Sequence, residues 1–158
     1  MQRYRDAEQQ RTLNNFSLHL RSSVSLHKSF RGISVQKLIA IAIAGAIGTL
    51  ARYWLGGLVQ VRFNGSFPAG TFAVNVLGSF LFGVVWALAE ERAVMSAETR
   101  TVILVGFMGA FTTFSTFMFD TNVLLRDSEW LLALGNVVAS VIIGLAALMV
   151  GIAIGRVF

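Results

Sequence analysis

One uncharged segment of this 158-residue chain combines residue types that can contact an ion. It runs from Gly106 to Phe117 and reads Gly-Phe-Met-Gly-Ala-Phe-Thr-Thr-Phe-Ser-Thr-Phe. Its hydroxyls can donate hydrogen bonds to an anion, and the edges of its phenylalanine rings have a partial positive charge. Phe111, Phe114 and Phe117 recur every three residues and therefore lie on one flank of a helix. Two interpretations remain open for these rings: they line an anion path, or they pack against lipid and protein.

The glycines of the same segment affect which backbone conformation it can adopt. In hydrocarbon every backbone polar group needs a partner, so irregular backbone occurs only where it is buried in protein or lines a cavity. A glycine-rich and hydroxyl-rich segment at membrane depth predicts a helix that is broken in the middle of the bilayer. A tightly packed seam between continuous helices, built from small residues, is the alternative interpretation.

Three further polar residues fall in apolar surroundings. Asn75 has two N–H donors for an anion, although a single asparagine in a membrane also fits a hydrogen bond between helices. Arg52, followed by two aromatic residues, either extends toward the membrane surface or raises the local anion concentration in a vestibule. Ser140 follows Asn136 by four residues, so both lie on one face of a helix.

The elements that must position these residues are membrane-spanning helices. Hydrophobic residues make up 55% of the chain and charged residues 13%. Four stretches reach the roughly 20 apolar residues that cross a bilayer. The predicted helices are residues 35–61, 67–89, 100–125 and 130–155, joined by short connections that make neighbours antiparallel. The fold class is therefore an all-α membrane protein with four transmembrane helices.

Composition also excludes several classes of function. The chain has no cysteine, and its histidines, His19 and His27, lie outside the predicted spans. Thiolate chemistry and histidine chemistry inside the membrane are therefore excluded, and no phosphate-binding loop is present, so we do not expect an enzyme. Seven of the thirteen Lys and Arg residues fall within residues 1–37, which favours contact with anionic lipid over nucleic acid. Residues 1–34 are expected to be a polar, basic and disordered extension of a functional domain at 35–158.

Three segments together resemble one known family, the CrcB/Fluc fluoride channels. They are Gly106–Phe117 followed by Asp120, Phe72–Gly83 with Asn75, and Gly48–Tyr53 with Arg52. The resemblance covers nearly all of residues 35–158. It implies a passive channel that exports fluoride from the cytoplasm across the cell (inner) membrane and so limits fluoride toxicity. It also implies an antiparallel, dual-topology homodimer, or a pair with a homologous subunit.

The resemblance assigns roles to individual residues. The implied lining of the fluoride pore is Asn75, Phe114, Ser115, Thr116, Phe117 and Ser140, and Arg52 is implied in the vestibule. The backbone carbonyls of Gly109 and Thr112, from both subunits, are implied to hold a structural sodium ion. The sequence departs from the family pattern at Ala110, Asp120 and Gly144, which replace a usual glycine, glutamate and hydroxyl residue.

Charge distribution is compatible with insertion in both orientations once residues 1–34 are set aside. The remaining basic residues near helix ends are Lys37, Arg92, Arg100 and Arg156 on one side, against Arg62 and Arg126 on the other.

Two other functions compete with the channel. A small four-helix multidrug transporter requires an acidic residue in the first helix, and Val35–Val61 contains none. A membrane scaffold that transports nothing would use the same polar residues only for packing.

Overall fold

The computed structural model describes residues 34–91 and 94–157. Contacts within the chain divide it into two units, Met1–Leu38 and Ile39–Phe158. Of the first unit the structure describes only the first residues of helix α2 and the residue before it. The disordered extension expected at residues 1–34 therefore lies almost entirely outside the described residues.

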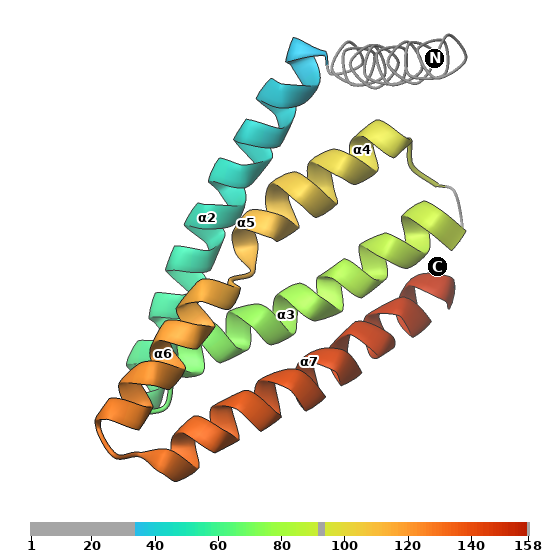
Figure 1. Cartoon of the computed structure of the whole chain (residues 1–158). Helices are drawn as coiled ribbons and strands as arrows, with labels where there is room; N and C mark the ends of the chain where they lie inside the picture. Colours follow the sequence, from blue (N-terminus) through green and yellow to red (C-terminus); the bar gives the residue numbers. More distant parts are fainter. Residues whose placement is uncertain (1–33, 92–93, 158) are drawn as a thin grey trace, which may run out of the picture. The chain divides into compact units, whose positions relative to one another are not determined.

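Every regular element in the described part of the chain is helical (Figure 1). In chain order the elements are α2 (Val35–Phe63), α3 (Ala69–Trp86), η1 (Ala87–Glu91), α4 (Ala97–Thr101), η2 (Val102–Met108), α5 (Gly109–Phe111), α6 (Phe114–Arg126) and α7 (Trp130–Val157). The segments η1 and η2 are π-helical, with wider turns than an α-helix. The predicted all-α class is confirmed.

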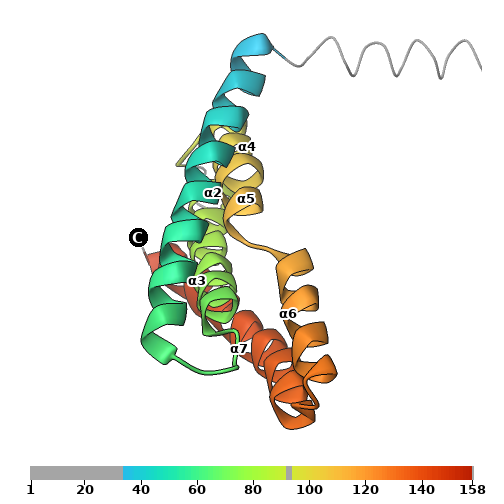
Figure 2. The same cartoon turned by 90° about the vertical axis from the view of Figure 1, so that its left-hand side faces the viewer.

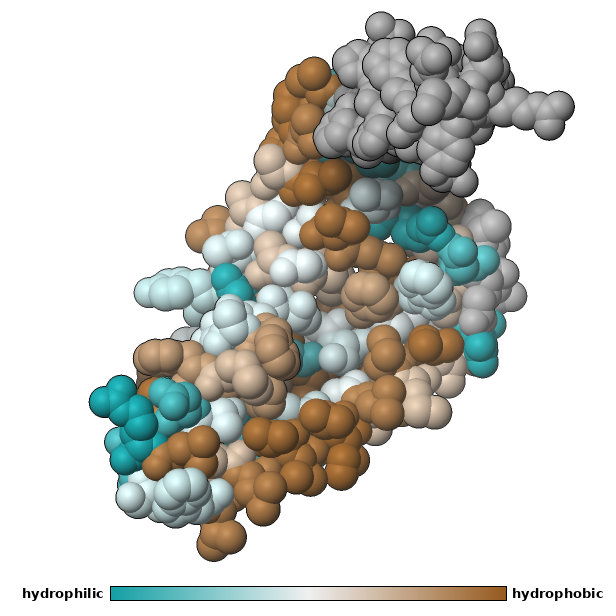
Figure 3. Space-filling view, in the orientation of Figure 1, coloured by the Kyte–Doolittle hydropathy of each residue, from teal (hydrophilic) through white to brown (hydrophobic). Residues whose placement is uncertain are grey.

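Four helical stretches are long and apolar enough to cross a membrane. They are Val35–Phe63, Ala69–Glu90, Ala97–Arg126 and Trp130–Val157. Their large apolar side chains are widely exposed, and in the most hydrophobic stretch of the first span only 6% of the residues are buried. Figure 3 shows hydrophobic residues in a band along α7, whereas hydrophilic residues gather at the turn between α6 and α7. This distribution suits surroundings of lipid, and the four predicted spans are confirmed to within a few residues.

The most extensive helix contact in the unit is that of α3 with α7, which lie side by side in Figures 1 and 2. Small residues make this approach possible. A Cβ atom added at Gly151 would meet the carbonyl oxygen of Phe80 and lie 3.1 Å from the backbone nitrogen of Val84. Gly155 approaches Val84 in the same way one turn later. Backbones that approach so closely gain van der Waals contact, which is a main source of helix association in lipid.

The third span consists of two helical pieces that both contact α3 but differ in their other neighbour. Its first piece, from α4 through η2 to α5, contacts α2, where Gly48 lies against the backbone of Phe107 and Phe111. Its second piece, α6, contacts α7 and α3. Figure 2 shows the extended link between the two pieces, which takes α6 away from the line of α4 and α5.

The α3–α7 contact gives a prediction with an internal control. Gly151→Ala should destabilise the folded protein by about 1–3 kcal/mol, because the new methyl group has no room beside Phe80. Gly135→Ala, in the same helix, should be neutral or slightly stabilising, because a Cβ there meets nothing within 4 Å. Thermal unfolding in detergent measures both. Equal melting temperatures for the two variants would contradict the packing described here.

Candidate functional site

The helical backbone is interrupted at two residues inside the third span. Helix α5 ends at Phe111, and α6 begins at Phe114. Between them Thr112 has φ −83° and ψ 157°, and Thr113 has φ −150° and ψ 119°, so both are extended. An extended pair removes backbone groups from the helical hydrogen-bond ladder, and in an apolar environment each of these groups needs another partner.

Asn75 of α3 supplies the partners for Thr113. Its side-chain oxygen accepts a hydrogen bond from the Thr113 backbone N–H at 2.8 Å, and its amide nitrogen donates to the Thr113 carbonyl at 3.0 Å. The side chain thus pairs with Thr113 as a neighbouring backbone would. Of the two sequence interpretations of Asn75, the hydrogen bond between helices is present. One of the two amide hydrogens is used in this pair, which leaves the other for a different acceptor.

Thr113 caps the N-terminus of α6, the helix that follows the interruption. The Thr113 hydroxyl oxygen accepts a hydrogen bond from the Thr116 backbone N–H at 3.2 Å, as is typical of a threonine before the first residue of a helix. In a continuous α-helix the N–H groups of Thr113 and Thr116 would instead pair with the carbonyls of Gly109 and Thr112. The hydrogen bonds at the interruption therefore release these two carbonyl oxygens from their usual helical partners.

A cavity of about 290 Å³ lies beside the interruption. Its lining consists of Asn75, Thr112, Thr113, Phe114, Phe117, Ser140 and Val141. Four of the six residues expected to line a pore, from α3, α6 and α7, therefore come together around one space. Their function in ion passage stays a prediction.

The two phenylalanine rings at this cavity differ in exposure. Their centroids are 5.9 Å apart, and their planes are inclined by 52°. Phe117 is buried at 7% exposure, whereas Phe114 is 73% exposed and open to whatever lies beside the chain. The hydrocarbon surface of Phe114 is therefore without cover in the single chain.

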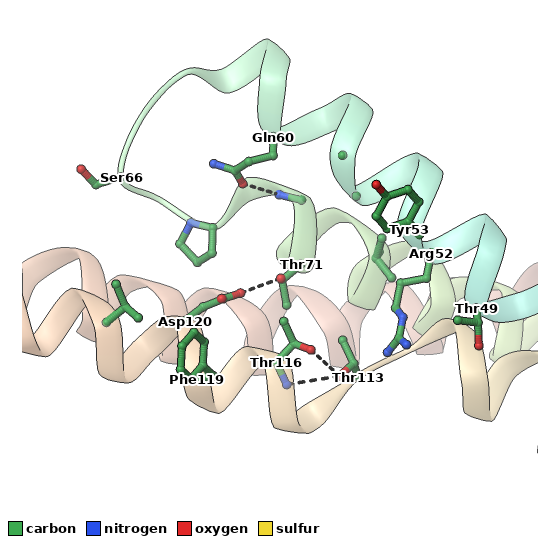
Figure 4. A pocket seen from close by; sticks show the side chains of 16 residues that line it. Thr49, Arg52, Tyr53, Gln60, Ser66, Thr71, Thr113, Thr116, Phe119 and Asp120 are labelled. Carbon is green, nitrogen blue, oxygen red and sulfur yellow. Dashed lines mark hydrogen bonds between the residues drawn. The ribbon is translucent and has the colours of Figure 1, made fainter.

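A second cavity, of about 700 Å³, also has Thr113 in its lining (Figure 4). Arg52, the residue expected in a vestibule, contributes to its lining, as do Thr116 and Asp120. Thr113 belongs to the lining of both cavities, so both adjoin the interrupted backbone. Ser115, also expected to line the pore, belongs to the lining of neither.

The larger cavity contains one cationic and one anionic side chain. The Thr71 hydroxyl donates a hydrogen bond of 2.6 Å to the Asp120 carboxylate, as the dashed line in Figure 4 marks. Among the residues that the structure describes, no ion pair joins Arg52 to Asp120. The Arg52 guanidinium is therefore available to attract an anion that enters this cavity, while the threonine fixes the position of the carboxylate.

Gln60 fixes the turn that closes the same cavity at the end of α2. Its amide nitrogen donates to the carbonyls of Gly65 and Phe67 at 3.4 and 3.2 Å, and its oxygen accepts from the Gly70 N–H at 3.0 Å (Figure 4). The residue before α3 is Pro68, whose side chain cannot cap the helix. Gln60 therefore satisfies one of the first N–H groups of α3 from another helix.

A buried polar pair joins α6 to α7. Asn136 is 1% exposed, and its amide donates a hydrogen bond of 2.9 Å to the Thr121 hydroxyl. That hydroxyl donates in turn to the carbonyl of Phe117 at 2.8 Å. The pair therefore connects α7 with the turn of α6 that contains one of the two cavity rings.

Several of these contacts were not anticipated from the sequence, although signals for them exist. Thr71 precedes Asn75 by four residues and Thr121 follows Phe117 by four, so each shares a helix face with a predicted site residue. Gln60 is an isolated polar residue near the end of an apolar helix, just before a turn with glycine and proline.

Comparison with known proteins identifies the family. Residues 39–152 match the family described as "CrcB-like protein, Camphor Resistance (CrcB)". The chain belongs to the CrcB-like family. The resemblance that the sequence suggested is thereby confirmed, and residues 1–38 lie outside the matched region.

Curated relatives of this CrcB-like chain have one name in common. A protein of Nitrosococcus oceani named "Fluoride-specific ion channel FluC" is 55% identical over 122 residues, which cover 77% of this chain and 98% of the relative. A protein of the same name from Solidesulfovibrio magneticus is 54% identical over equal shares. A third, from Desulforapulum autotrophicum, is 52% identical over 76% of this chain and 96% of its own length.

The buried pair of α6 and α7 gives a prediction about coupling. Asn136→Leu and Thr121→Val should each destabilise the protein, and the pair should be coupled by about 0.6–1.7 kcal/mol, the range found for hydrogen bonds between membrane helices. The double variant should therefore lose less stability than the sum of the single variants. Unfolding of the three variants and the parent in mixed micelles provides the cycle. Strict additivity would show that the contact does not stabilise the fold.

Proposed function

We propose that this chain forms a passive, fluoride-selective channel that exports fluoride from the cytoplasm and so limits its toxicity. The observation on which the proposal rests is the identity of up to 55%, over nearly the full length of relatives named fluoride-specific ion channels. The convergence of Asn75, Phe114, Phe117 and Ser140 on one cavity at the helix interruption supports it independently.

The chemistry of the small cavity suits fluoride. Fluoride is small and strongly hydrated, so a pore must replace its water with donors that still allow the ion to leave. The second N–H of Asn75, the Ser140 hydroxyl and the edges of Phe114 and Phe117 are such donors. None of the residues that line this cavity is charged, so no fixed countercharge holds the ion.

We assign the larger cavity to the entrance of the pore. Arg52 attracts anions there, and Thr116 extends the hydroxyl lining toward it. The hydrogen bond from Thr71 holds the Asp120 carboxylate at its own side of the cavity. Ser115, next to the cap of α6, has a long contact of 3.5 Å with the Thr113 hydroxyl, and its role in the path is proposed only from the family resemblance.

The functional unit in this proposal is an antiparallel homodimer, or a pair with a homologous subunit, in which the third span is broken at mid-membrane. The interruption at Thr112 and Thr113 falls close to the centre of the span Ala97–Arg126, which supports the mid-membrane position. A second subunit would cover the exposed ring of Phe114. Outside residues 1–34 the basic residues near helix ends number four on one side and two on the other, a weak bias that is compatible with insertion in both orientations. The chain would lie in the cell (inner) membrane as a multi-pass protein.

A structural sodium ion between the two subunits completes the proposal. Its ligands would be the backbone carbonyls of Gly109 and Thr112 from both subunits. The donor set supports this assignment, because the hydrogen bonds of Thr113 and Thr116 release these two carbonyls. Carbonyl oxygens suit a hard cation such as sodium, and the ion would make the interior electropositive without a fixed charge in the fluoride path.

Ion flux tests the channel directly. Liposomes that contain the purified full chain should release fluoride without comparable release of chloride. Phe117→Ile should reduce fluoride flux by about tenfold or more, equivalent to ~1.4 kcal/mol, because an aliphatic side chain has no electropositive edge. Phe82→Ile is the matched control, because Phe82 stacks on Trp86 and does not line the small cavity. Equal fluoride and chloride efflux would refute the channel, and full flux in Phe117→Ile would refute the ring assignment.

Cation dependence tests the sodium site without reference to flux. If sodium binds only the folded dimer, each tenfold rise in sodium above its dissociation constant should add ~1.4 kcal/mol to the free energy of unfolding. Thr112→Ser should keep this dependence, because the proposed ligand is the backbone carbonyl. Melting temperatures in sodium and in N-methylglucamine salts of equal ionic strength measure the effect. Identical melting temperatures in both salts would refute the sodium site. They would not affect the channel proposal, which the flux measurement tests separately.

A further inference from the structure

A third hollow, which is entirely apolar, lies on the opposite flank of α3 from the candidate pore. It has a volume of about 580 Å³ and lies where the end of α2 and the following turn meet α3 (Figure 1). Its wall includes Phe63 of α2, Phe67 of the turn, Phe72, Val76 and Phe80 of α3, and Ala147 of α7. Every residue that lines this groove has a hydrocarbon side chain. We refer to it as the α2–α3 groove.

The groove has the length of one lipid leaflet. Along α3 its lining runs from Ala69 to Phe80, which at about 1.5 Å per residue corresponds to roughly 16 Å. The hydrocarbon core of a bilayer is about 30 Å thick, so one leaflet contributes about 15 Å. The groove therefore extends from the turn between the first and second spans to about the middle of the membrane.

The groove and the candidate pore face different sides of α3. Ala73 and Leu77 line the groove, and each is two residues from Asn75. Two residues correspond to about 200° of helical rotation, so the groove and the small cavity lie on nearly opposite sides of α3. A second subunit that covered only the Asn75 side of α3 would leave the groove uncovered.

A positive charge lies next in the chain to a residue that lines the groove. Arg62 immediately precedes Phe63 in the last turn of α2, and its side chain is exposed. Among the described residues Arg62 forms no ion pair. An arginine at the membrane surface attracts the phosphate of an anionic lipid, which adds charge complementarity to the apolar fit.

We propose that the α2–α3 groove is a binding site for one phospholipid, with an acyl chain between α2 and α3 and an anionic headgroup at Arg62. The bound chain fills the space beneath the turn that Gln60 organises and so supports the wall of the larger cavity. The occupant is a lipid of the leaflet that faces the α2–α3 turn.

The test uses the full-length protein and two lipids with the same acyl chains. Native mass spectrometry of delipidated protein, titrated with phosphatidylglycerol or phosphatidylcholine, should detect one retained lipid per subunit. Phosphatidylglycerol should bind about fivefold more tightly, as expected for one arginine near the membrane surface. Arg62→Gln should remove this preference. Arg126→Gln is the matched control, because Arg126 is also exposed in the last turn of a helix and does not line the groove.

Blocking the groove tests the acyl-chain site. Ala73→Phe should weaken retention of both lipids at least tenfold, because the ring occupies the space of the chain. Ala146→Phe adds the same ring at an exposed position of α7 outside the groove lining and should retain the lipid. Fluoride flux and the elution volume of each variant verify that it is folded.

A single cysteine distinguishes lipid from a second subunit. The chain has no native cysteine, so Ala73→Cys places the only thiol in the groove. Phosphatidylglycerol should slow its reaction with a membrane-soluble maleimide in a concentration-dependent manner. Unchanged lipid retention in Ala73→Phe, no protection of the thiol, or a disulfide-linked dimer of the Ala73→Cys variant in membranes would each overturn the proposal. The last result would assign the groove to a second copy of the chain.

Discussion

Partners for the backbone at Thr112 and Thr113 are the requirement on which the arrangement of this protein depends. Water is absent from the middle of a bilayer, so an interrupted helix is stable there only if other groups replace the lost hydrogen bonds. Asn75 does this for both backbone groups of Thr113, and Thr113 does it for Thr116. Because the main partner comes from α3, the interruption exists only while α3 stays beside it.

The hydrogen bonds that meet this requirement also determine where the candidate pore side chains lie. The Asn75–Thr113 pair holds the start of α6 against α3, and Phe114 and Phe117 lie in the first turn of that helix. Thr113 of this pair lines both a small cavity without charged residues and a larger one with Arg52 and Asp120. In the proposed channel, an ion is attracted on one side of Thr113 and meets neutral donors on the other. Attraction and easy release are therefore assigned to different groups of residues.

Much of the fold follows from the sequence, because a membrane imposes strong and local rules. Apolar stretches of sufficient length give four spans, and two glycines four residues apart, Gly151 and Gly155, are a sequence signal for the close packing found there. Glycines and hydroxyl residues are concentrated at 106–117, the segment in which Thr112 and Thr113 are extended, and a helix broken at mid-membrane stays a proposal. These features depend on residue types within one segment.

The details of the site depend on contacts between segments and were harder to foresee. The sequence offers two roles for Asn75, and only the distance to Thr113, 38 residues away, decides that it pairs with backbone. The partners of Asp120 and Asn136 likewise lie on other helices. Gln60 and Thr71 were overlooked because a single polar residue at a helix end has too many ordinary explanations.

The division of the third span into two pieces has a mechanical consequence. Its first piece packs on α2 through Gly48, whereas α6 is attached to α3 and α7 by the side chains of Asn75, Thr71 and Asn136. The first piece also contacts α3, so the two pieces share that neighbour and differ in the other, which is α2 for the first piece and α7 for α6. The segment that contains the rings is attached to the α3–α7 pair by these side chains. A displacement of α2 therefore need not alter the spacing between the rings and Asn75.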